Sequence, residues 1–297
     1  MSVLEFRDIH RSYGRGEEVL SGASFSVEAG QVVGLLGKNG AGKTTLIHIA
    51  MGMLRAQSGS VRVLGLDSEK DAVAMKRRVG FVSEDQILSP AMRVKQVIGL
   101  HRDLYPGWDP ELEGQLRRRF SFSDRARVKS LSKGEARQLA LLCAVAHRPE
   151  LLILDEPAGG LDPAARREFL ETSIDLLSDG GTSILFSSHH MSDVERMADR
   201  IVLLHDRQVL IDAELDTLRE SYAVAVMPAG TGLDPAVIAD SAACLRIRER
   251  RGALRAVFKG NAERTRALLE GELGVSGASV AQVPLEELFV ELLGSKS

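Results

Sequence analysis

Short apolar segments recur along the first part of the chain in two patterns. Apolar and polar residues alternate in Val3–Ile9 and Ser24–Val27, as expected for antiparallel strands with one buried face. Leu151–Leu154 and Ser183–Phe186 are continuous apolar runs, which are typical of parallel strands buried on both faces. Gln31–Leu36 is a further short apolar run, and a glycine follows it. These patterns predict an α/β domain.

Helical patterns lie between and after these strands. Asp109-Pro110 and Asp162-Pro163 each resemble an N-cap residue followed by proline at the first helical position. The predicted helices are Thr45–Leu54, Pro110–Phe120, Gly134–Ala146, Pro163–Leu177 and Met191–Ala198.

The composition changes near Met227–Gly232, and we place a domain boundary close to Ser221. The two predicted domains are therefore 1–220 and 221–297. The order of elements in the second, βαββαβ plus a closing helix, fits a small α+β domain of ferredoxin-like type. Its predicted elements are strand Tyr222–Val226, helix Pro235–Ala242, strands Leu245–Glu249 and Ala253–Phe258, helix Ala262–Leu273, strand Ser279–Val283 and helix Leu285–Leu293.

Composition places the chain among soluble globular proteins, with 44% hydrophobic and 27% charged residues. A formal charge of −3 argues against a general nucleic-acid or anionic-membrane binder. No apolar stretch approaches the roughly 20 residues that a membrane-spanning helix needs. The two cysteines, Cys143 and Cys244, suit a reducing cytosol, and Cys143 lies in an apolar run typical of a core position. We expect a cytoplasmic protein that reaches a membrane only through a partner.

One segment carries a phosphate-binding motif in the appropriate context. Gly37–Thr44 fits the pattern G-x-x-x-x-G-K-[ST] and lies between an apolar strand and a helix. Its glycines allow successive N–H groups to point at phosphate oxygens, next to a helix N-terminus. Lys43 is expected at the β- and γ-phosphates, and Thr44 offers a hydroxyl to Mg²⁺. The predicted ATP-binding residues of this segment are Gly37, Lys38, Asn39, Gly40, Ala41, Gly42, Lys43, Thr44 and Thr45.

Two adjacent carboxylates follow the apolar run Leu151–Leu154. Asp155 is placed to hold Mg²⁺ through its water shell, and Glu156 is placed to polarise the attacking water as general base. Together with the phosphate loop, the pair predicts hydrolysis of a nucleoside triphosphate.

With these motifs in order, the chain resembles the ATP-binding-cassette (ABC) ATPase family from Val3 to about Arg219. Leu131–Glu135 (LSKGE) is similar to the family's LSGGQ signature, with Lys133 in place of glycine and Glu135 in place of glutamine. The resemblance implies an ABC-type P-loop NTPase fold, with a mixed sheet, flanking helices and a helical subdomain. It also implies that Ser132, Gly134 and Glu135 contact ATP across a dimer.

The same resemblance assigns four further positions. Tyr13 lies where the family stacks an aromatic ring on adenine, and Asp162 belongs to the loop that crosses the dimer interface. His189 occupies the position of the switch histidine that contacts the γ-phosphate. Glu84 stands where the family has a glutamine at Mg²⁺ and the attacking water, and it still offers an oxygen ligand. Gln86 is the alternative for that role.

The implied function is that of an ATP-hydrolysing transporter subunit, peripheral at the inner face of the cell membrane. It would work as a dimer beneath a separate membrane-spanning subunit, with export the expected direction. The segment Glu84–Phe120 resembles the helical insertion that docks such partners. The alternative is a soluble ABC ATPase acting on nucleic acid or ribosomes. Versions acting on DNA need a long coiled coil, and translation types carry two cassettes, neither of which this sequence shows.

Overall fold

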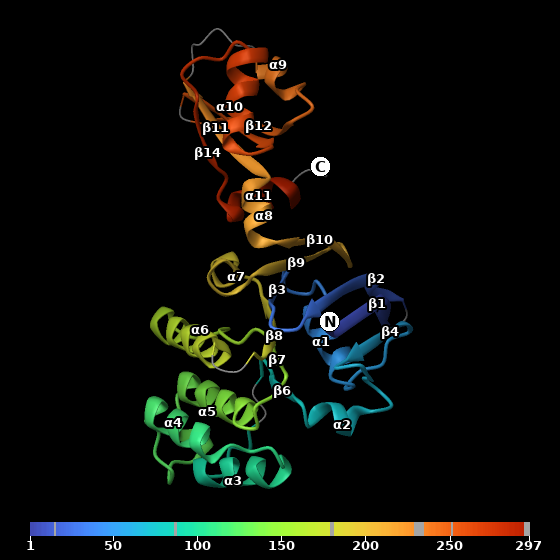
Figure 1. Cartoon of the computed structure of the whole chain (residues 1–297), viewed down its shortest axis with the longest axis vertical. Coiled ribbons are helices and arrows are strands. Elements are labelled where there is room, and N and C mark those ends of the chain that lie inside the picture. Colours follow the sequence, from blue (N-terminus) through green and yellow to red (C-terminus); the bar gives the residue numbers. More distant parts are fainter. Residues whose placement is uncertain (15, 86–87, 179–180, 229–234, 251, 294–297) are drawn as a thin grey trace. The chain divides into compact units, whose positions relative to one another are not determined.

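The chain folds into two compact units, Met1–Asp212 and Ala213–Ser297 (Figure 1). The computed structural model describes all residues except 15, 86–87, 179–180, 229–234, 251 and 294–297. The boundary between the units lies before the predicted position, Ser221. Helix α8 (Leu215–Glu220) belongs to the second unit, because it contacts the first strand of that unit. Residues 229–232 of the composition shift lie outside the described residues, as does Gln86.

The first unit contains two sheets. A four-stranded antiparallel sheet has the order β2-β1-β4-β5, and a six-stranded sheet has the order β10-β9-β3-β8-β7-β6. The strands of the first sheet are β1 (Ser2–Tyr13), β2 (Glu17–Glu28), β4 (Ser58–Val63) and β5 (Leu66–Asp67). Those of the second are β3 (Val32–Leu36), β6 (Val79–Val82), β7 (Leu151–Leu154), β8 (Ser183–Ser188), β9 (Arg200–His205) and β10 (Gln208–Glu214).

The main core of this unit forms around helix α1 (Lys43–Ala50). Leu46, Ile47 and Ile49 of the helix are buried in one cluster with apolar residues from β1, β2 and β4 and from the parallel strands. The alternating pattern of β1 and β2 therefore arises because one face of their sheet packs on this core. Helix α1, and the loop before it, are fixed by packing with strands of both sheets.

The parallel arrangement predicted for Leu151–Leu154 and Ser183–Phe186 is confirmed. Leu151 pairs with Ser183, and Leu154 pairs with Phe186, in a parallel ladder. Strand β3 is parallel to β8, and β6 is parallel to β7. The carboxyl ends of β3, β6, β7 and β8 therefore meet at one edge of the sheet, where ligands bind in open α/β folds.

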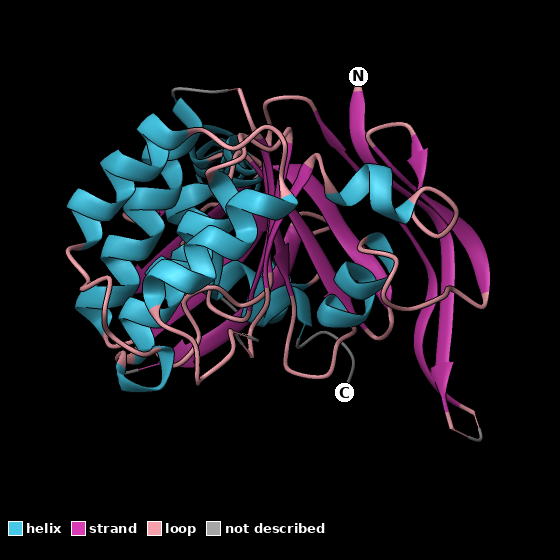
Figure 2. Cartoon of the chain, turned by 90° about the horizontal axis from the view of Figure 1, so that it is seen from below, coloured by secondary structure: helices cyan, strands magenta, loops and turns pink. Residues whose placement is uncertain are grey.

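Helices α3, α4, α5 and α6 gather on one side of the parallel strands, and the antiparallel sheet lies on the other (Figures 1 and 2). An internal ion pair ties α3 to α4: the buried Glu113 accepts hydrogen bonds from Arg102, Arg117 and the Trp108 indole. Burial alone would raise the pKa of Glu113, but these bonds lower it below its ordinary value. The helices of this unit beyond α1 are α2 (Ala72–Lys76), α3 (Val94–Leu104), α4 (Pro110–Phe120), α5 (Lys133–Val145), α6 (Pro163–Ser178) and α7 (Met191–Met197).

Both predicted N-caps are confirmed. Asp109 accepts from the backbone N–H groups of Glu111 and Leu112 at the start of α4. Asp162 accepts from those of Ala164 and Ala165 at the start of α6. Each carboxylate satisfies donors that have no partner within their helix.

Two helix predictions were too long. Helix α1 ends at Ala50 instead of Leu54, because Gly52 adopts a left-handed φ of 60° that a helix cannot continue through. In the second unit, α9 (Pro235–Ala239) ends before Ala242. The predicted helix Ala262–Leu273 is α10 (Ala262–Ala267) followed by a π-helical turn, η2 (Leu268–Glu272).

The second unit is built on one antiparallel sheet with the order β12-β13-β11-β14. One face is covered by α9 and α10, whose apolar residues form a second core with those of the strands. The remaining elements are β11 (Tyr222–Pro228), β12 (Cys244–Arg250), β13 (Ala253–Lys259), β14 (Ser279–Gln282) and α11 (Leu285–Leu293).

Candidate nucleotide site

The loop Gly37–Thr44 connects β3 to α1 at the carboxyl edge of the parallel sheet. Gly42 has a φ of 103°, and a Cβ there would lie 2.8 Å from Leu20 Cδ2, so only glycine fits. Within the part of the chain that the structure describes, no side chain caps the N-terminus of α1. Its first-turn N–H groups therefore face the loop and are suited to an anion.

A cavity of about 380 Å³ opens above this loop, within the usual size range of small-molecule sites. It brings together segments that are far apart in sequence: Tyr13 from β1, the phosphate loop, Glu84 after β6 and Glu156 after β7. Tyr13 is exposed, and its hydroxyl lies 3.3 Å from Thr45 Oγ1. The lining residues are Tyr13, Glu17, Val19, Asn39, Gly40, Ala41, Gly42, Lys43, Thr44, Thr45, Glu84 and Glu156.

Lys43 is buried at the base of the cavity. Its ammonium donates to the carbonyl oxygens of Gly37 at 2.7 Å and Lys38 at 3.3 Å. It also lies 3.1 Å from Glu156 Oε1. Gly37 and Lys38 thus contribute carbonyls that hold the lysine, although they do not line the cavity themselves.

The two carboxylates after β7 have different surroundings. Asp155 is 1% exposed, and its Oδ1 accepts from Ser187 Oγ at 2.6 Å. Ser187 Oγ in turn accepts from the Glu156 backbone N–H at 2.7 Å. Glu156 has a left-handed φ of 43°, a strained conformation for a residue with a side chain. The hydroxyl of Ser187 therefore fixes the turn that separates the two carboxylates.

His189 lies beside Glu156, with Nδ1 2.8 Å from Glu156 Oε2. Lys43, Glu156 and His189 thus form a continuous chain of polar contacts. The neighbouring His190 packs on the His189 ring, with centroids 3.9 Å apart, and burial lowers the pKa of His190. His189, predicted as the switch histidine, therefore has a ring nitrogen in direct contact with the predicted base.

The predicted metal-side residues lie on three segments. Thr44 and Glu84 line the cavity, and Asp155 is buried at the end of β7. Among the residues that the structure describes, no group of three or more His, Cys, Asp or Glu side chains is arranged to hold a metal.

The signature segment does not line this cavity. Ser132 caps α5 in a reciprocal arrangement: its backbone N–H donates to Glu135 Oε2 at 2.7 Å, and its Oγ accepts from the Glu135 N–H. Glu135 is therefore used as the capping-box acid. Ser132 is exposed, and Gly134 and Asp162 likewise lie outside the cavity lining.

Sequence reasoning missed Arg137, which connects the signature helix to the cavity. Arg137 is 6% exposed, and burial lowers its pKa. Its guanidinium donates to the Glu84 carbonyl at 2.6 Å and the Ser83 carbonyl at 3.3 Å. It also donates to the carbonyls of Glu156 and Gly159, both at 3.4 Å. The only signal in the sequence is an arginine placed before a long apolar run in α5.

Comparison with known proteins gives consistent results. The profile of the ABC transporter family matches residues 20–159. The ABC transporter ATP-binding protein YtrB of Bacillus subtilis is 29% identical over 99% of both chains. The Nod factor export ATP-binding protein I of Burkholderia lata is 31% identical over 99% of this chain and 98% of its own.

Among solved structures, a dimeric ATP-binding cassette in a post-hydrolysis state, bound to ADP and Pi, superposes with a TM-score of 0.64 at 19% identity. The match covers 71% of this chain and 98% of the other. It confirms the expected P-loop NTPase cassette fold.

Proposed function

This chain belongs to the ABC transporter family as an ATP-binding subunit, and from that premise we propose that it hydrolyses ATP to drive export through a separate membrane-spanning protein. The observation that carries the proposal is the shared cavity of the phosphate loop and Glu156, with Lys43 Nζ 3.1 Å from Glu156 Oε1. This contact supports the proposal that Lys43 binds phosphate next to Glu156 as the general base.

Different residues of the cavity would bind different parts of ATP. The N–H groups of the loop and the α1 N-terminus would hold the phosphates, and Lys43 would turn from Glu156 and the Gly37 carbonyl towards them. Tyr13 at the exposed rim offers a ring face for adenine.

The donors near the phosphate loop fit Mg²⁺, because they are hydroxyl and carboxylate oxygens. Thr44, Asp155 and Glu84 would hold it, and the ion would neutralise charge on the phosphate oxygens. Ser187 orients Asp155 for this role through the 2.6 Å hydrogen bond. Arg137 fixes the backbone that carries Glu84.

Glu156 would act as the general base. Its carboxylate contacts Lys43 on one oxygen and His189 on the other. When the phosphates attract Lys43, Oε1 becomes free to accept a proton from water, and His189 keeps the carboxylate oriented. The strained turn at Glu156 holds the side chain above the buried Asp155.

A second copy of the chain would complete each site. Ser132, Gly134, Glu135 and Asp162 lie outside the cavity of their own chain, yet the capped N-terminus of α5 is exposed and suited to a phosphate. The dimeric cassette with ADP and Pi supports this arrangement. We propose that ATP closes the dimer because it binds the closed state better.

The proposed membrane partner and the proposed direction of transport are supported by different observations. No described helix is both long and apolar enough to span a bilayer. The region 84–120, with α3 and α4 joined through Glu113, would dock the membrane-spanning subunit at the inner face of the membrane. Export is supported by the name of the Burkholderia relative, which covers almost the whole chain.

The division into an ATPase domain and a C-terminal accessory domain is also part of the proposal. The sheet order β12-β13-β11-β14 with antiparallel pairing supports a ferredoxin-like topology for the second. We propose that it stabilises or regulates the dimer.

Replacing Glu156 tests the proposal. In Glu156→Gln we expect hydrolysis to fall by about 10²–10⁴-fold, with ATP binding retained and an ATP-dependent dimer visible in size-exclusion chromatography with light scattering. The exposed Glu270→Gln is the matched control and should behave as wild type. A Glu156→Gln protein that turns over ATP at the normal rate would contradict the assignment. Purification from a detergent extract should also recover a multi-helix membrane protein.

A further inference from the structure

The second unit has a sheet face that α9 and α10 do not cover, and three arginines lie on it. Ile247 and Ala256 point into the core of the unit, so Arg246, Arg248 and Arg255 point to the opposite face. Arg248 and Arg255 are direct cross-strand partners on β12 and β13. Like charges placed opposite each other in a sheet repel, so this pairing needs anions nearby.

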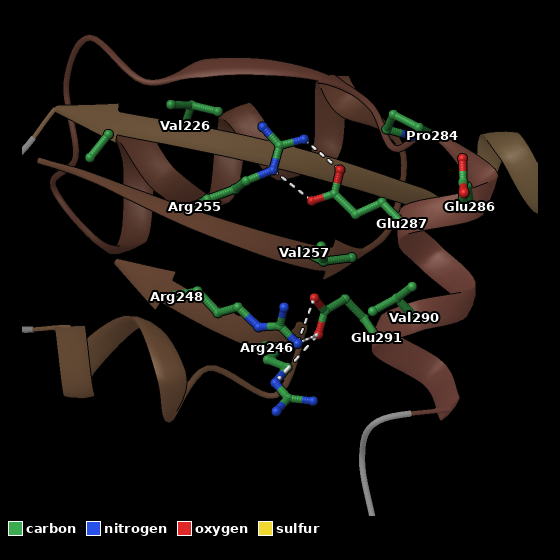
Figure 3. Close-up of a pocket in the computed structure, with 11 residues that line it drawn as sticks. Val226, Arg246, Arg248, Arg255, Val257, Pro284, Glu286, Glu287, Val290 and Glu291 are labelled. Atoms are coloured by element: carbon green, nitrogen blue, oxygen red, sulfur yellow. Dashed lines mark hydrogen bonds and ion pairs between the residues drawn. The ribbon is translucent and has the colours of Figure 1, made fainter. Parts of the chain in front are cut away.

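Helix α11 supplies two carboxylates for these arginines. Glu287 and Glu291 are four residues apart and face the sheet together (Figure 3). Arg255 makes a two-nitrogen contact with Glu287, with Nε 2.6 Å from Oε1. Glu291, which is 7% exposed, lies 3.1 Å from Arg248 Nη2 and 3.4 Å from Arg246 Nε.

Helix α11 does not pack tightly against this face of the sheet. A cavity of about 640 Å³ remains between them, which is the size of a small-molecule site. Val226 and Val257 form its floor, and Pro284 and Val290 belong to the helix side (Figure 3). Charged and apolar side chains therefore lie on both sides of the cavity, and the helix side also carries Glu286.

Arg248 and Arg255 keep donor capacity towards this cavity. The contact with Glu287 uses Nε and Nη2 of Arg255, and Nη1 takes no part in it (Figure 3). The side chains of Arg248 and Arg255 are 50% and 38% exposed. Each guanidinium has five N–H donors, more than the two carboxylates engage.

We propose that this cleft binds a small amphipathic anion, an organic molecule with a carboxylate, sulfonate or phosphate head and an apolar body. The head would lie between Arg248 and Arg255, whose planar guanidiniums suit such groups. The body would lie on Val226, Val257 and Val290. Glu287 competes with the ligand for Arg255, so binding loosens the contact of α11 with the sheet.

The opposite effects of removing an arginine and removing a glutamate test this site. The full chain, saturated with Mg-ATP, is titrated with 8-anilinonaphthalene-1-sulfonate, a fluorescent amphipathic anion. Arg248→Gln and Arg255→Gln should each weaken probe binding by about tenfold, the equivalent of one charge-assisted hydrogen bond. Glu287→Gln should strengthen it by roughly threefold to tenfold, because Arg255 loses its competing anion. Arg266→Gln, exposed on α10, is the matched control.

The following results would contradict the proposed binding site. Unchanged affinity in both arginine variants would show that the guanidiniums do not contact the probe. Stronger probe binding in the arginine variants as well as in Glu287→Gln would show that the probe only reports apolar surface uncovered when α11 loosens. Weaker binding in Glu287→Gln would show that the pair serves only to hold the helix. Circular dichroism of each variant identifies any that fails to fold, and the sign of the Glu287→Gln effect then decides.

Two further experiments distinguish a free ligand from a lipid. Displacement of the probe by decanoate, but not by phosphatidylglycerol vesicles, assigns a free amphiphile. Arg248-dependent flotation with phosphatidylglycerol vesicles, and not with phosphatidylcholine vesicles, assigns a lipid. Displacement by neither overturns the proposal.

Discussion

At the scale of single residues, the nucleotide cavity is lined by one lysine, Lys43, and by three glutamates, Glu17, Glu84 and Glu156. Lys43 is already engaged by Glu156, so Glu84 adds a negative charge where phosphates would bind. A carboxylate at this point is favourable only when a cation lies between it and the phosphates. We therefore expect that the glutamate, in place of the family's glutamine, makes hydrolysis more dependent on Mg²⁺.

This charge balance gives a prediction for Glu84→Gln. We expect the Mg²⁺ concentration for half-maximal hydrolysis to rise by about tenfold, because a neutral amide binds a hard cation less well than a carboxylate. The measurement is a Mg²⁺ titration of turnover at fixed ATP. Asp85→Asn, next to Glu84 and outside the cavity lining, is the control. A Glu84→Gln enzyme with unaltered Mg²⁺ dependence and turnover would remove Glu84 from the metal site.

Arg137 gives a second prediction at this scale, because it binds carbonyls of both loops that carry Glu84 and Glu156. In Arg137→Ala the loops lose their common anchor, and a small displacement of a catalytic group costs about 10²-fold in rate. We expect kcat to fall by roughly that factor while KM for ATP changes by less than about threefold, since the phosphate loop has its own support.

A purely structural role for Arg137 would affect the kinetics differently. Arg137→Lys keeps the charge but not the planar fork, so it should restore only part of kcat. Gln138→Ala serves as the helix control. A rise in KM at constant kcat would contradict the positioning role, and a thermal unfolding curve for each variant separates kinetics from stability.

At the scale of elements, the sequence was most informative where a local signal sets the bounds of an element. Leu151–Leu154 and Pro110–Phe120 have the bounds that their patterns predict, because an apolar run and an Asp-Pro cap act locally. Strand β4 was missed, since Ser58–Val63 is mostly exposed and is held as a strand by pairing with β1 and β5. The long helix α3 lacks a capping residue type that sequence reasoning would recognise.

His147, just after the end of α5, gives a prediction about how the stability of the protein depends on pH. His147, the second residue beyond α5, is buried and stacks on Tyr105, with ring centroids 4.0 Å apart. Burial lowers its pKa from 6.5 to about 4. The unfolded chain therefore binds a proton more readily than the folded chain, so His147 decreases stability as pH falls from 6.5 towards 4.

Urea unfolding at several pH values measures this effect. Between pH 7 and pH 4.5 the wild-type free energy of unfolding should fall by on the order of 2–3 kcal/mol more than that of His147→Gln. Gln138→Ala in α5, which changes no titratable group, should keep the wild-type slope. Parallel curves for wild type and His147→Gln would show that His147 does not cause the pH dependence.

At the scale of the whole molecule, the chain consists of two units with separate cores. The sequence motifs all fall in the first, which is why the resemblance drawn from them ends near Arg219, although whole-chain relatives match 99% of the chain. For the second unit, the only signals in the sequence were a change of composition and the predicted order of elements. Its arginine face could not be foreseen, because Arg248 and Arg255 come together only through strand register.

The separation of the cores predicts the behaviour of a shortened chain. A protein ending at Glu214, after β10, should remain folded and bind ATP within about threefold of the full chain, since separate cores support separate units. If the second unit stabilises the dimer, ATP-dependent association should weaken at the same protein concentration. Calorimetric ATP titration and light scattering measure the two effects. A folded fragment without ATP affinity would show that the site needs the second unit.

The position of Ser132 outside its own chain's cavity has a further consequence. A chain with Lys43→Ala and a chain with Ser132→Ala would each be inactive alone, because every site in a uniform pair contains one damaged half. Mixed in one tube, the two defective proteins should regain activity, because a pair of unlike partners assembles one composite site from the undamaged halves of both. Such mutual rescue would appear only if the two halves of each site come from different molecules.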